Sequence, residues 1–334
     1  MLKRVNLEIT YSCNLSCDFC YLKSTGKLNA PRRELGLERL KAFIDSVASP
    51  DVDLYVTGGE PFARPDCLDI LEYGKARAGH CGVNTNGTLL DARAIERLAR
   101  IGLDYVIFSL HGTPSVHDGS CGRGGTFSRV LENIRALSAL SARGTEIMVN
   151  CVVNERNFGD LEGLFLACAD AGAHRVVLGH LQFLSPREAR AHAKQWRSFD
   201  SRPCRVITPI RPSIAKTDTA ALSRGIERLT RRGWRGVHLD LRPGLTRSEL
   251  ARWYDGVPET SGRCQAAQEV LVVAPNGDVR ACQLYDNVLG NVADQDWRDV
   301  WWSQDAMLFR ERVSNALFPG CARCCLRFDF ARCY

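Results

Sequence analysis

The sequence contains no long hydrophobic run. Within its 334 residues, no stretch approaches the roughly 18 uncharged apolar residues that a membrane-spanning helix requires. The first residues, MLKRVNLEIT, lack the apolar core of a secretory signal and run directly into a strand-like pattern. Internal repeats and low-complexity stretches are also absent. These absences argue against a membrane-bound, exported or repeat protein, and we expect a cytoplasmic protein.

Cysteine, in contrast, is abundant. The chain has 15 cysteines, and in a reducing compartment clustered cysteines are more often metal ligands or catalytic groups than disulfides. Cys13, Cys17 and Cys20 lie near one end of the chain, and six more lie between Cys264 and Cys333. The other six are scattered, as buried thiols usually are. We therefore expect metal sites near both ends of the chain.

The formal net charge of +6 raises the question of nucleic-acid binding. The arginines are spread along the chain, and the densest pair, Arg231 and Arg232, closes a helix-like segment. Positive charge at that end of a helix favourably faces the helix dipole. A solvated face explains the pattern better than a binding patch, so we expect neither a nucleic-acid nor a membrane partner.

Residues 1–183 alternate between strand-like and helix-like segments. The strand-like runs are residues 5–10, 52–57, 81–86, 104–110, 146–154 and 174–183. Between them, apolar residues recur at helical spacing, most clearly in 34–48, 91–102 and 127–144. Six such steps predict an α/β fold with parallel strands, a partial (β/α)6 TIM-like barrel. In such barrels the chemistry lies at the carboxyl ends of the strands.

The rest of the chain divides into two parts. Residues 184–260 hold three helix-like segments and a strand-like run at 237–241, and they form either extra barrel strands or a bridging, substrate-covering region. In residues 261–334, the stretch 269–284 is typical of a hairpin and 297–313 of a tryptophan-rich helix. We expect this last part to be a small α+β domain.

The motif CNLSCDFC places Cys13, Cys17 and Cys20 directly after the first strand. Three thiolates on one short loop can each bind one iron of a 4Fe–4S cube and leave the fourth iron open. A zinc site is the alternative, although it would require a fourth ligand nearby. The spacing, with the aromatic Phe19 before the last cysteine, resembles the signature of the radical S-adenosylmethionine (SAM) superfamily.

Further motifs extend this resemblance over residues 1–183. TGGEPF at the end of the second strand resembles the family's GGEP motif, which implies that Gly58, Gly59, Glu60 and Pro61 contact SAM, with Glu60 as an acceptor for the ammonium group. The resemblance also implies that Asn86, in NTNGT, and Ser109, in SLHG, contact SAM. Arg123 is the candidate for the SAM carboxylate, and we expect His117 and Asp118 to fix its loop.

The second cysteine group resembles the auxiliary-cluster domain of SPASM and twitch enzymes. The resemblance implies that Cys264, Cys282, Cys321 and Cys324 hold a second, auxiliary 4Fe–4S cluster. The full SPASM pattern would place a cysteine at position 330, where this chain has phenylalanine. The shorter, one-cluster twitch form is therefore favoured, with zinc as the alternative metal. Cys325 and Cys333 remain spare and could replace an assumed ligand.

Polar residues at the ends of the fifth and sixth strands are candidates for a substrate pocket. These are Asn150, Cys151, His180 and Gln182. Cys151 is a candidate catalytic hydrogen-atom donor if the reaction is an epimerisation, although a small buried core residue is the simpler interpretation. The histidine and amides could equally be hydrogen-bonded core residues.

The resemblance implies a radical SAM enzyme. In that family, one electron from the cluster cleaves SAM to a 5′-deoxyadenosyl radical, which abstracts a substrate hydrogen atom. The reaction could end in oxidation, epimerisation or bond formation on a peptide or small-molecule natural product, with flavodoxin or ferredoxin as electron donor. The first strand begins within ten residues of Met1, which mildly favours a small molecule or a separately delivered peptide. Two alternatives are a non-catalytic iron–sulfur electron-transfer protein and a zinc-dependent nucleic-acid-binding module.

Overall fold

The computed structural model describes residues 1–141, 144–211, 218–232, 236–256 and 260–325. Within these residues one sheet of ten strands has the order β10-β9-β8-β1-β2-β3-β4-β5-β6-β7. The strands are β1 (Arg4–Thr10), β2 (Asp53–Gly58), β3 (His80–Thr85), β4 (Tyr105–Ser109), β5 (Glu146–Val153), β6 (Arg175–His180), β7 (His238–Arg242), β8 (Val270–Val273), β9 (Asp278–Arg280) and β10 (Val288–Asn291). Strands β1 to β7 pair in sequence order and run parallel, which confirms the partial TIM-like barrel.

Among the described residues of the region 184–260, one strand joins this barrel. Strand β7 pairs in parallel with β6, and Gly179 lies opposite Arg242 in their register. Of the two possibilities that the sequence left open for this region, extra strands are therefore part of the answer. The barrel sheet has seven parallel strands in sequence order rather than the six that were expected.

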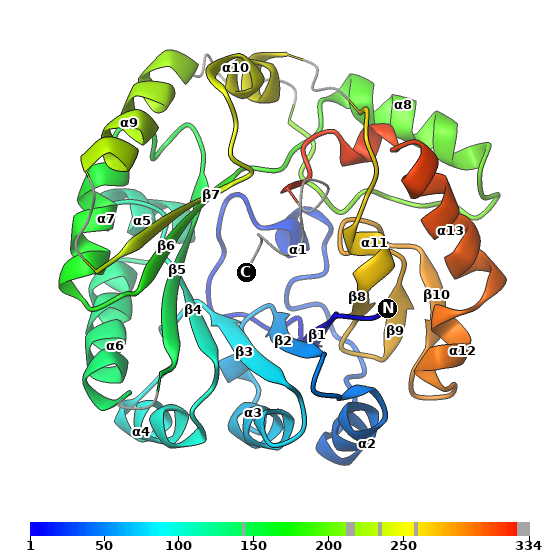
Figure 1. Cartoon of the computed structure of the whole chain (residues 1–334), viewed down its shortest axis with the longest axis horizontal. Coiled ribbons are helices and arrows are strands. Elements are labelled where there is room, and N and C mark those ends of the chain that lie inside the picture. Colours follow the sequence, from blue (N-terminus) through cyan, green and yellow to red (C-terminus); the bar gives the residue numbers. More distant parts are fainter. Residues whose placement is uncertain (142–143, 212–217, 233–235, 257–259, 326–334) are drawn as a thin grey trace.

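Helices surround the strands (Figure 1). They are α1 (Tyr21–Ser24), α2 (Leu37–Val47), α3 (Cys67–Lys75), α4 (Ala92–Ile101), α5 (Pro114–Cys121), α6 (Thr126–Leu140), α7 (Leu161–Asp170), α8 (Pro186–Arg197), α9 (Thr219–Arg232), α10 (Arg247–Asp255), α11 (Ala266–Glu269), α12 (Trp297–Trp301) and α13 (Gln304–Asn315), with 3-10 turns η1 (Pro61–Ala63) and η2 (Pro319–Cys321). Helix α4 shows why they form: Asp91 caps its first turn, Ile95 and Leu98 face the core, and Gly102 ends it at φ +65°.

Two helical segments differ from expectation. Helix α5 was not predicted, because its sequence PSVHDGSC is polar and contains glycine. The predicted helix 297–313 is divided into α12 and α13, because the Ser303 side chain accepts a hydrogen bond from the backbone N–H of Ala306 and starts a new helix. No helix of the described ranges is long and apolar enough to cross a membrane.

The C-terminal strands continue the barrel sheet. Strand β8 runs parallel to β1, with Val270 opposite Arg4, and β9 and β10 follow in antiparallel order. The predicted hairpin at 269–284 is therefore present, and Figure 1 shows β8 beside β1. A second core of aromatic side chains fills the space beyond this edge. Its largest members are Trp196, Tyr285, Phe309 and Phe318.

Candidate active site

A cavity of about 370 Å³ lies at the carboxyl ends of the parallel strands. Because side chains alternate along a strand, every second residue faces the barrel interior. The inward pairs are Asn6 and Glu8 on β1, Tyr55 and Thr57 on β2, Ile107 and Ser109 on β4, Asn150 and Val152 on β5, and Val177 and Gly179 on β6. This is the position at which a TIM-like barrel carries its chemistry.

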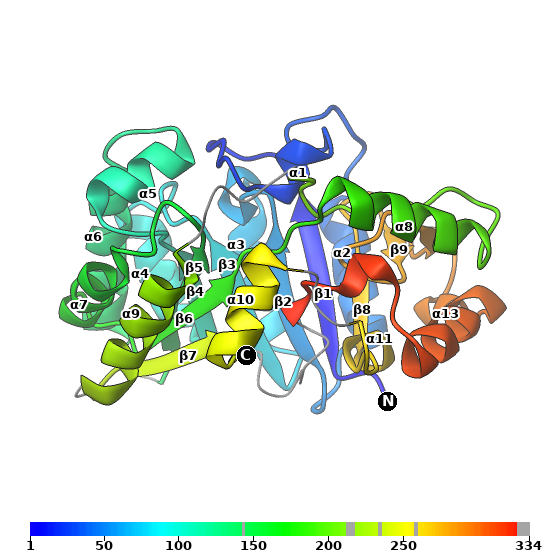
Figure 2. The ribbon, with the colours of Figure 1, turned by 90° about the horizontal axis from the view of Figure 1, so that it is seen from above.

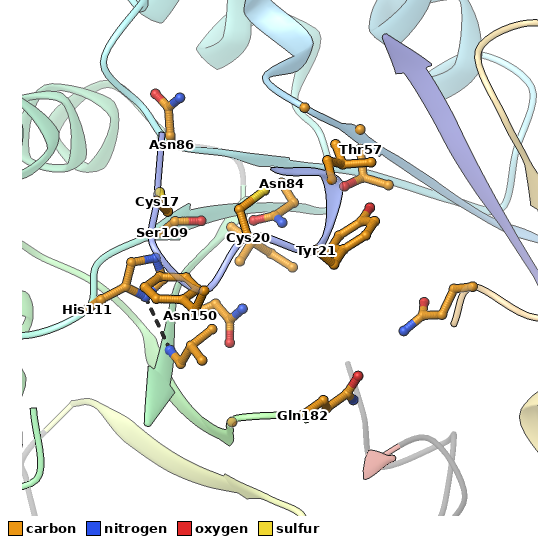
Figure 3. Close-up of a pocket in the computed structure, with 18 of the residues that line it drawn as sticks. Cys17, Cys20, Tyr21, Thr57, Asn84, Asn86, Ser109, His111, Asn150 and Gln182 are labelled. Carbon is orange, nitrogen blue, oxygen red and sulfur yellow. Dashed lines mark hydrogen bonds between the residues drawn. The ribbon is translucent and has the colours of Figure 1, made fainter. Parts of the chain in front are cut away.

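The loop of residues 13–20, here called the cysteine loop, borders this cavity. Its thiols, Cys13, Cys17 and Cys20, are half-buried and all line the cavity. Figure 2 shows the loop ahead of α1 at the same end of the strands as α5. Figure 3 shows Cys17 and Cys20 among the side chains that line the cavity, as Ser109 also does. Three thiols facing one cavity fit the donor set of an iron–sulfur cluster.

Hydrogen bonds from the protein itself hold the cysteine loop. The backbone N–H of Cys13 donates to Oδ1 of Asn29 at 2.8 Å, and Nδ2 of Asn29 donates to the Cys13 carbonyl at 3.1 Å. The backbone N–H groups of Ser16 and Asp18 donate to carbonyls in α5. Burial raises the pKa of the Cys13 thiol to about 11, so binding of a metal there would release a proton.

Cys121, which the sequence did not single out, lies beside this loop. Its sulfur is 3.7 Å from the sulfur of Cys17, and it also lines the cavity. His117, one turn earlier on α5, has Nε2 3.7 Å from the same sulfur, while its Nδ1 accepts from the backbone N–H of His111. Asp118 accepts hydrogen bonds at the start of α6. His117 and Asp118 thus fix this segment, as expected.

The glycines after β2 pack against β1. A Cβ atom at Gly58 would lie 2.2 Å from the carbonyl oxygen of Thr10, and one at Gly59 would lie 2.4 Å from that of Ser12. Only glycine fits so close to another backbone. Both glycines also line the cavity. They therefore place the predicted SAM site next to the chain that leads into the cysteine loop.

Glu60 is fully buried and does not line the cavity. Its carboxylate accepts hydrogen bonds from Thr85 Oγ1 at 2.7 Å, from the Asn86 backbone N–H at 2.6 Å and from the Phe62 backbone N–H at 3.1 Å. Burial raises the pKa of Glu60 to about 7. Glu60 was expected to accept from the SAM ammonium group. Its carboxylate instead forms hydrogen bonds that connect the turn after β2 to the end of β3. Pro61 is likewise buried, at the start of η1.

The other three predicted SAM contacts differ in position. Asn86 lines the cavity, and its Nδ2 donates to Asn14 Oδ1 at 3.0 Å and lies 3.7 Å from the Cys13 sulfur. Ser109 also faces the cavity (Figure 3). Arg123 lies exposed in the turn between α5 and α6 and does not line the cavity. The structure therefore does not bring Arg123 to the predicted site.

The predicted hydrogen-atom donor Cys151 faces away from the cavity. Asn150 and Val152 face inward on β5, so the alternation of the strand turns Cys151 outward. Cys151 is fully buried in the core, where Nδ2 of Asn157 donates to its sulfur at 3.6 Å. Its assignment as catalytic is corrected to a core residue. The other pocket candidates do line the cavity: Asn150, His180 and Gln182.

The second cysteine group lies against the aromatic core. Cys264, Cys282, Cys321 and Cys324 all belong to it or pack on it. Burial raises the pKa of the Cys282 thiol, and the nearby Cys264 and Cys321 thiols raise it further. The hydroxyl of Tyr285 lies 2.9 Å from the sulfur of Cys321. Four thiols from separate segments in one core fit the ligands of a second iron–sulfur cluster.

Two of the remaining cysteines lie near these sites. Cys325 lines the barrel cavity, where Nε2 of Gln182 donates to its sulfur at 3.2 Å. Cys204 packs on the same aromatic core as the auxiliary thiols. Cys333 lies outside the described residues. Of the cysteines that the structure describes, all are free thiols, and no three described His, Cys, Asp or Glu side chains are arranged to hold a single metal ion.

A buried ion pair connects the two sites. The guanidinium of Arg280 lies 2.5 Å from the carboxylate of Glu8, and both side chains are less than 5% exposed. The hydroxyl of Tyr11 donates to Glu8 at 2.7 Å, and that of Tyr21, which directly follows the cysteine loop, donates at 3.3 Å. Because Arg280 precedes Cys282 by two residues, this network links the cysteine loop to the auxiliary site.

Replacement of Cys282 by alanine is expected to lower the iron content of anaerobically reconstituted protein from about eight to about four atoms per chain, which is the loss of one four-iron cluster. Cys204→Ala is the matched control, because Cys204 packs on the same core but is not a predicted ligand. It should leave the iron content unchanged. An unchanged iron content in Cys282→Ala would exclude Cys282 as an essential ligand.

Comparisons with known proteins agree with this geometry. The chain matches the family model of the radical SAM superfamily over residues 7–165 and that of the SPASM iron–sulfur cluster-binding domain over residues 264–325. It is 27% identical to the AdoMet-dependent heme synthase of Methanosarcina barkeri, over 95% of this chain and 86% of that protein. It is 29% identical to the mycofactocin maturase MftC of Mycobacterium ulcerans, over 95% of this chain and 78% of that protein.

Solved structures show the same fold. SuiB of Streptococcus suis bound to its precursor peptide SuiA superposes with a TM-score of 0.66 at 16% sequence identity. The match covers 91% of this chain and 65% of that chain.

A parallel partial barrel with three thiols on the loop after its first strand fits an iron–sulfur enzyme, and the two family models identify it as one. The chain belongs to the radical SAM superfamily and carries a C-terminal SPASM domain. It is therefore an enzyme of the radical SAM oxidoreductase or maturase type, and not a non-catalytic electron-transfer protein or a zinc module. Its cofactors are a 4Fe–4S cluster with SAM and an auxiliary iron–sulfur cluster.

Proposed function

We propose that this enzyme cleaves SAM reductively and abstracts a hydrogen atom from a peptide or small-molecule natural product. One observation carries the proposal: the thiols of the cysteine loop and the polar residues of β5 to β7 share a single cavity. When bound, the cluster and SAM together supply a 5′-deoxyadenosyl radical. The protein's part is to hold both groups beside the substrate and to keep water away from them.

The residues that line the cavity near the cysteine loop have two proposed roles, binding of the cluster and binding of SAM. We propose that Cys13, Cys17 and Cys20 hold the cluster that binds SAM. Around it, the proposed SAM contacts that line the cavity are Gly58, Gly59, Asn86 and Ser109. Glu60 supports this wall from behind, through its hydrogen bonds to the end of β3.

The auxiliary cluster has its own proposed ligand set, Cys264, Cys282, Cys321 and Cys324. Because four thiols would fill every iron position of that cluster, electron relay is a better role for it than binding of substrate. A flavodoxin or ferredoxin is the proposed electron donor. The single-cluster, twitch-like form of the domain remains a prediction.

The names of the relatives support both substrate classes. SuiB, solved with its precursor peptide, favours a peptide, and a heme synthase favours a small molecule. Oxidation, epimerisation and bond formation all remain within the proposal. The SAM-cleaving step is common to all three.

The proposal predicts that reconstituted, reduced protein forms 5′-deoxyadenosine and methionine from SAM. The reaction should be run anaerobically with dithionite, and the products measured by liquid chromatography and mass spectrometry. Omission of the reductant is the control, because SAM cleavage requires an electron. Absence of 5′-deoxyadenosine in protein with its full iron content would contradict the proposed function.

A further inference from the structure

Few charged side chains line the cavity. Among the described residues that line it, Arg242 is the only lysine or arginine and Glu8 the only acid. Glu8 is already paired with Arg280. Burial lowers the pKa of the three lining histidines, so they are neutral near pH 7; they are His111, His117 and His180. The cavity therefore presents one cationic side chain, at the end of β7.

The guanidinium of Arg242 is held in a fixed orientation. Asp240, two residues earlier on the same face of β7, accepts from Nε at 3.1 Å and from Nη2 at 2.8 Å. Arg242 is only 7% exposed. A buried arginine stays charged, and its planar group suits recognition of a carboxylate.

Gly179 leaves space beside Arg242. The two residues lie opposite each other in the β6–β7 register, and both line the cavity. A Cβ atom at Gly179 would lie 3.8 Å from Asn150 Oδ1, which is an ordinary contact. Figure 3 shows Asn150 and Gln182 on the side of the cavity away from Asn86. A side chain at 179 would thus occupy space between Asn150 and Arg242.

His180 adds an acceptor to the same wall. The hydroxyl of Tyr254 has one proton and lies 3.1 Å from the carbonyl of Val153, which can only accept. If the hydroxyl donates to that carbonyl, Nδ1 of His180, which lies 3.0 Å from the hydroxyl oxygen, is the protonated ring nitrogen. In that tautomer Nε2 is the acceptor of the ring, and His180 lines the cavity.

We propose that Arg242, Gly179 and His180 form a substrate subsite, in which Arg242 binds a carboxylate of the substrate and His180 Nε2 accepts from an adjacent N–H or O–H group. The inference rests on the proposed function and names its substrate class: a carboxylate-bearing molecule such as an amino acid or an acidic peptide residue. A carboxylate fits better than a dianionic phosphate, because Asp240 already neutralises part of the arginine's charge.

This subsite is separate from the proposed SAM site. Gly58, Asn86 and Ser109 belong to the ends of β2, β3 and β4, whereas Arg242 ends β7, three strands further along the sheet. The two carboxylates, one from SAM and one from the substrate, would therefore bind at the ends of different strands.

The test uses N-trifluoroacetylglycine and its C-terminal amide as probes, followed by fluorine NMR in oxidised, reconstituted enzyme with SAM present. Wild-type enzyme should bind the acid about tenfold or more tightly than the amide. Arg242→Gln should bind the two equally. Arg100→Gln, an exposed position on α4, is the control and should keep the preference. Equal binding by wild-type enzyme, or an unchanged preference in Arg242→Gln, would overturn the subsite.

Position 179 supplies a second, size-matched test. Gly179→Ala fits the available space and should bind the acid as wild-type enzyme does. Gly179→Leu should fill the space and weaken binding of both probes. Undiminished binding by Gly179→Leu would place the probe elsewhere and contradict the proposal. For His180, the N-methyl form of the acid should bind wild-type enzyme more weakly, and equal binding would remove the acceptor role.

The affinity for SAM shows whether Arg242 binds the carboxylate of the substrate or that of SAM. Arg242→Gln should keep the wild-type dissociation constant for SAM, measured by equilibrium dialysis. A fall in SAM affinity by the same factor as the probe would assign Arg242 to SAM and overturn the inference. Formation of 5′-deoxyadenosine is measured in the same preparations. A preference for the acid without this product would contradict the proposed function and leave the subsite standing.

Discussion

Replacement of Cys17 by alanine is expected to abolish formation of 5′-deoxyadenosine and to remove about four iron atoms per chain, the content of one cluster. Cys17 is half-buried, lines the cavity and lies on a loop that the protein holds in place through backbone hydrogen bonds. Loss of its sulfur leaves two loop thiols, which is one fewer than the three protein ligands that an open-site cluster needs. Iron analysis and the SAM-cleavage assay measure both effects.

Cys121→Ala is the matched control for this prediction. The sulfur of Cys121 lies 3.7 Å from that of Cys17, so the two variants remove neighbouring thiols from the same cavity. Cys121 lies on α5, outside the cysteine loop, and its variant should keep the cluster and produce 5′-deoxyadenosine. If Cys121→Ala lost the cluster while Cys17→Ala kept it, the ligand assignment would have to be exchanged.

The second large effect is expected on stability. Arg280→Met leaves the buried Glu8 carboxylate without its cationic partner, and removal of one member of such a pair costs about 3–5 kcal/mol. For a chain of this length we expect a melting temperature lower by about 4–7 °C. The measurement is anaerobic thermal unfolding followed by circular dichroism, with iron analysis of the same samples. The double variant Glu8→Leu/Arg280→Met should recover part of the loss.

The matched control is Arg231→Met. Arg231 lies 3.7 Å from Glu227 in an exposed pair on α9, and such pairs contribute about 0–1 kcal/mol. Its melting temperature should be close to that of the wild-type protein. A shift in Arg280→Met no larger than that of the control would show that the buried pair does not stabilise the fold.

The barrel was predictable because its strands and helices have strong local patterns. Strands β1 to β6 and helices such as α4 alternate in order, and the sequence specifies their caps. Strand β7 was ambiguous because HLDLR is short and polar. Helix α5 was missed because tertiary contacts support it: the carbonyls of Ser120 and Cys121 accept from the cysteine loop. No local pattern encodes those contacts.

The site was predictable where a motif carried it. The cysteine loop and the Gly58–Pro61 turn were both located correctly at strand ends. Cys121 was missed because it lies 104 residues from Cys17 in sequence. The error at Cys151 was avoidable, since alternation in the middle of a strand turns Asn150 and Cys151 to opposite faces of the sheet, and only one of them can face the cavity. Arg242 had a usable signal too: acceptance of 237–241 as a barrel strand would have placed it at the carboxyl end, where barrel sites lie.

The parallel pairing of β8 with β1 limits how this protein can be cut or recombined. The hairpin β8–β9 covers the edge of the strand that leads into the cysteine loop. Truncation after α10 would expose that edge, and an unpaired edge strand invites association with other chains. We therefore expect that the C-terminal domain cannot be removed without disturbing the barrel. An exchange of this domain between relatives would have to preserve the β1–β8 register, with Val270 opposite Arg4.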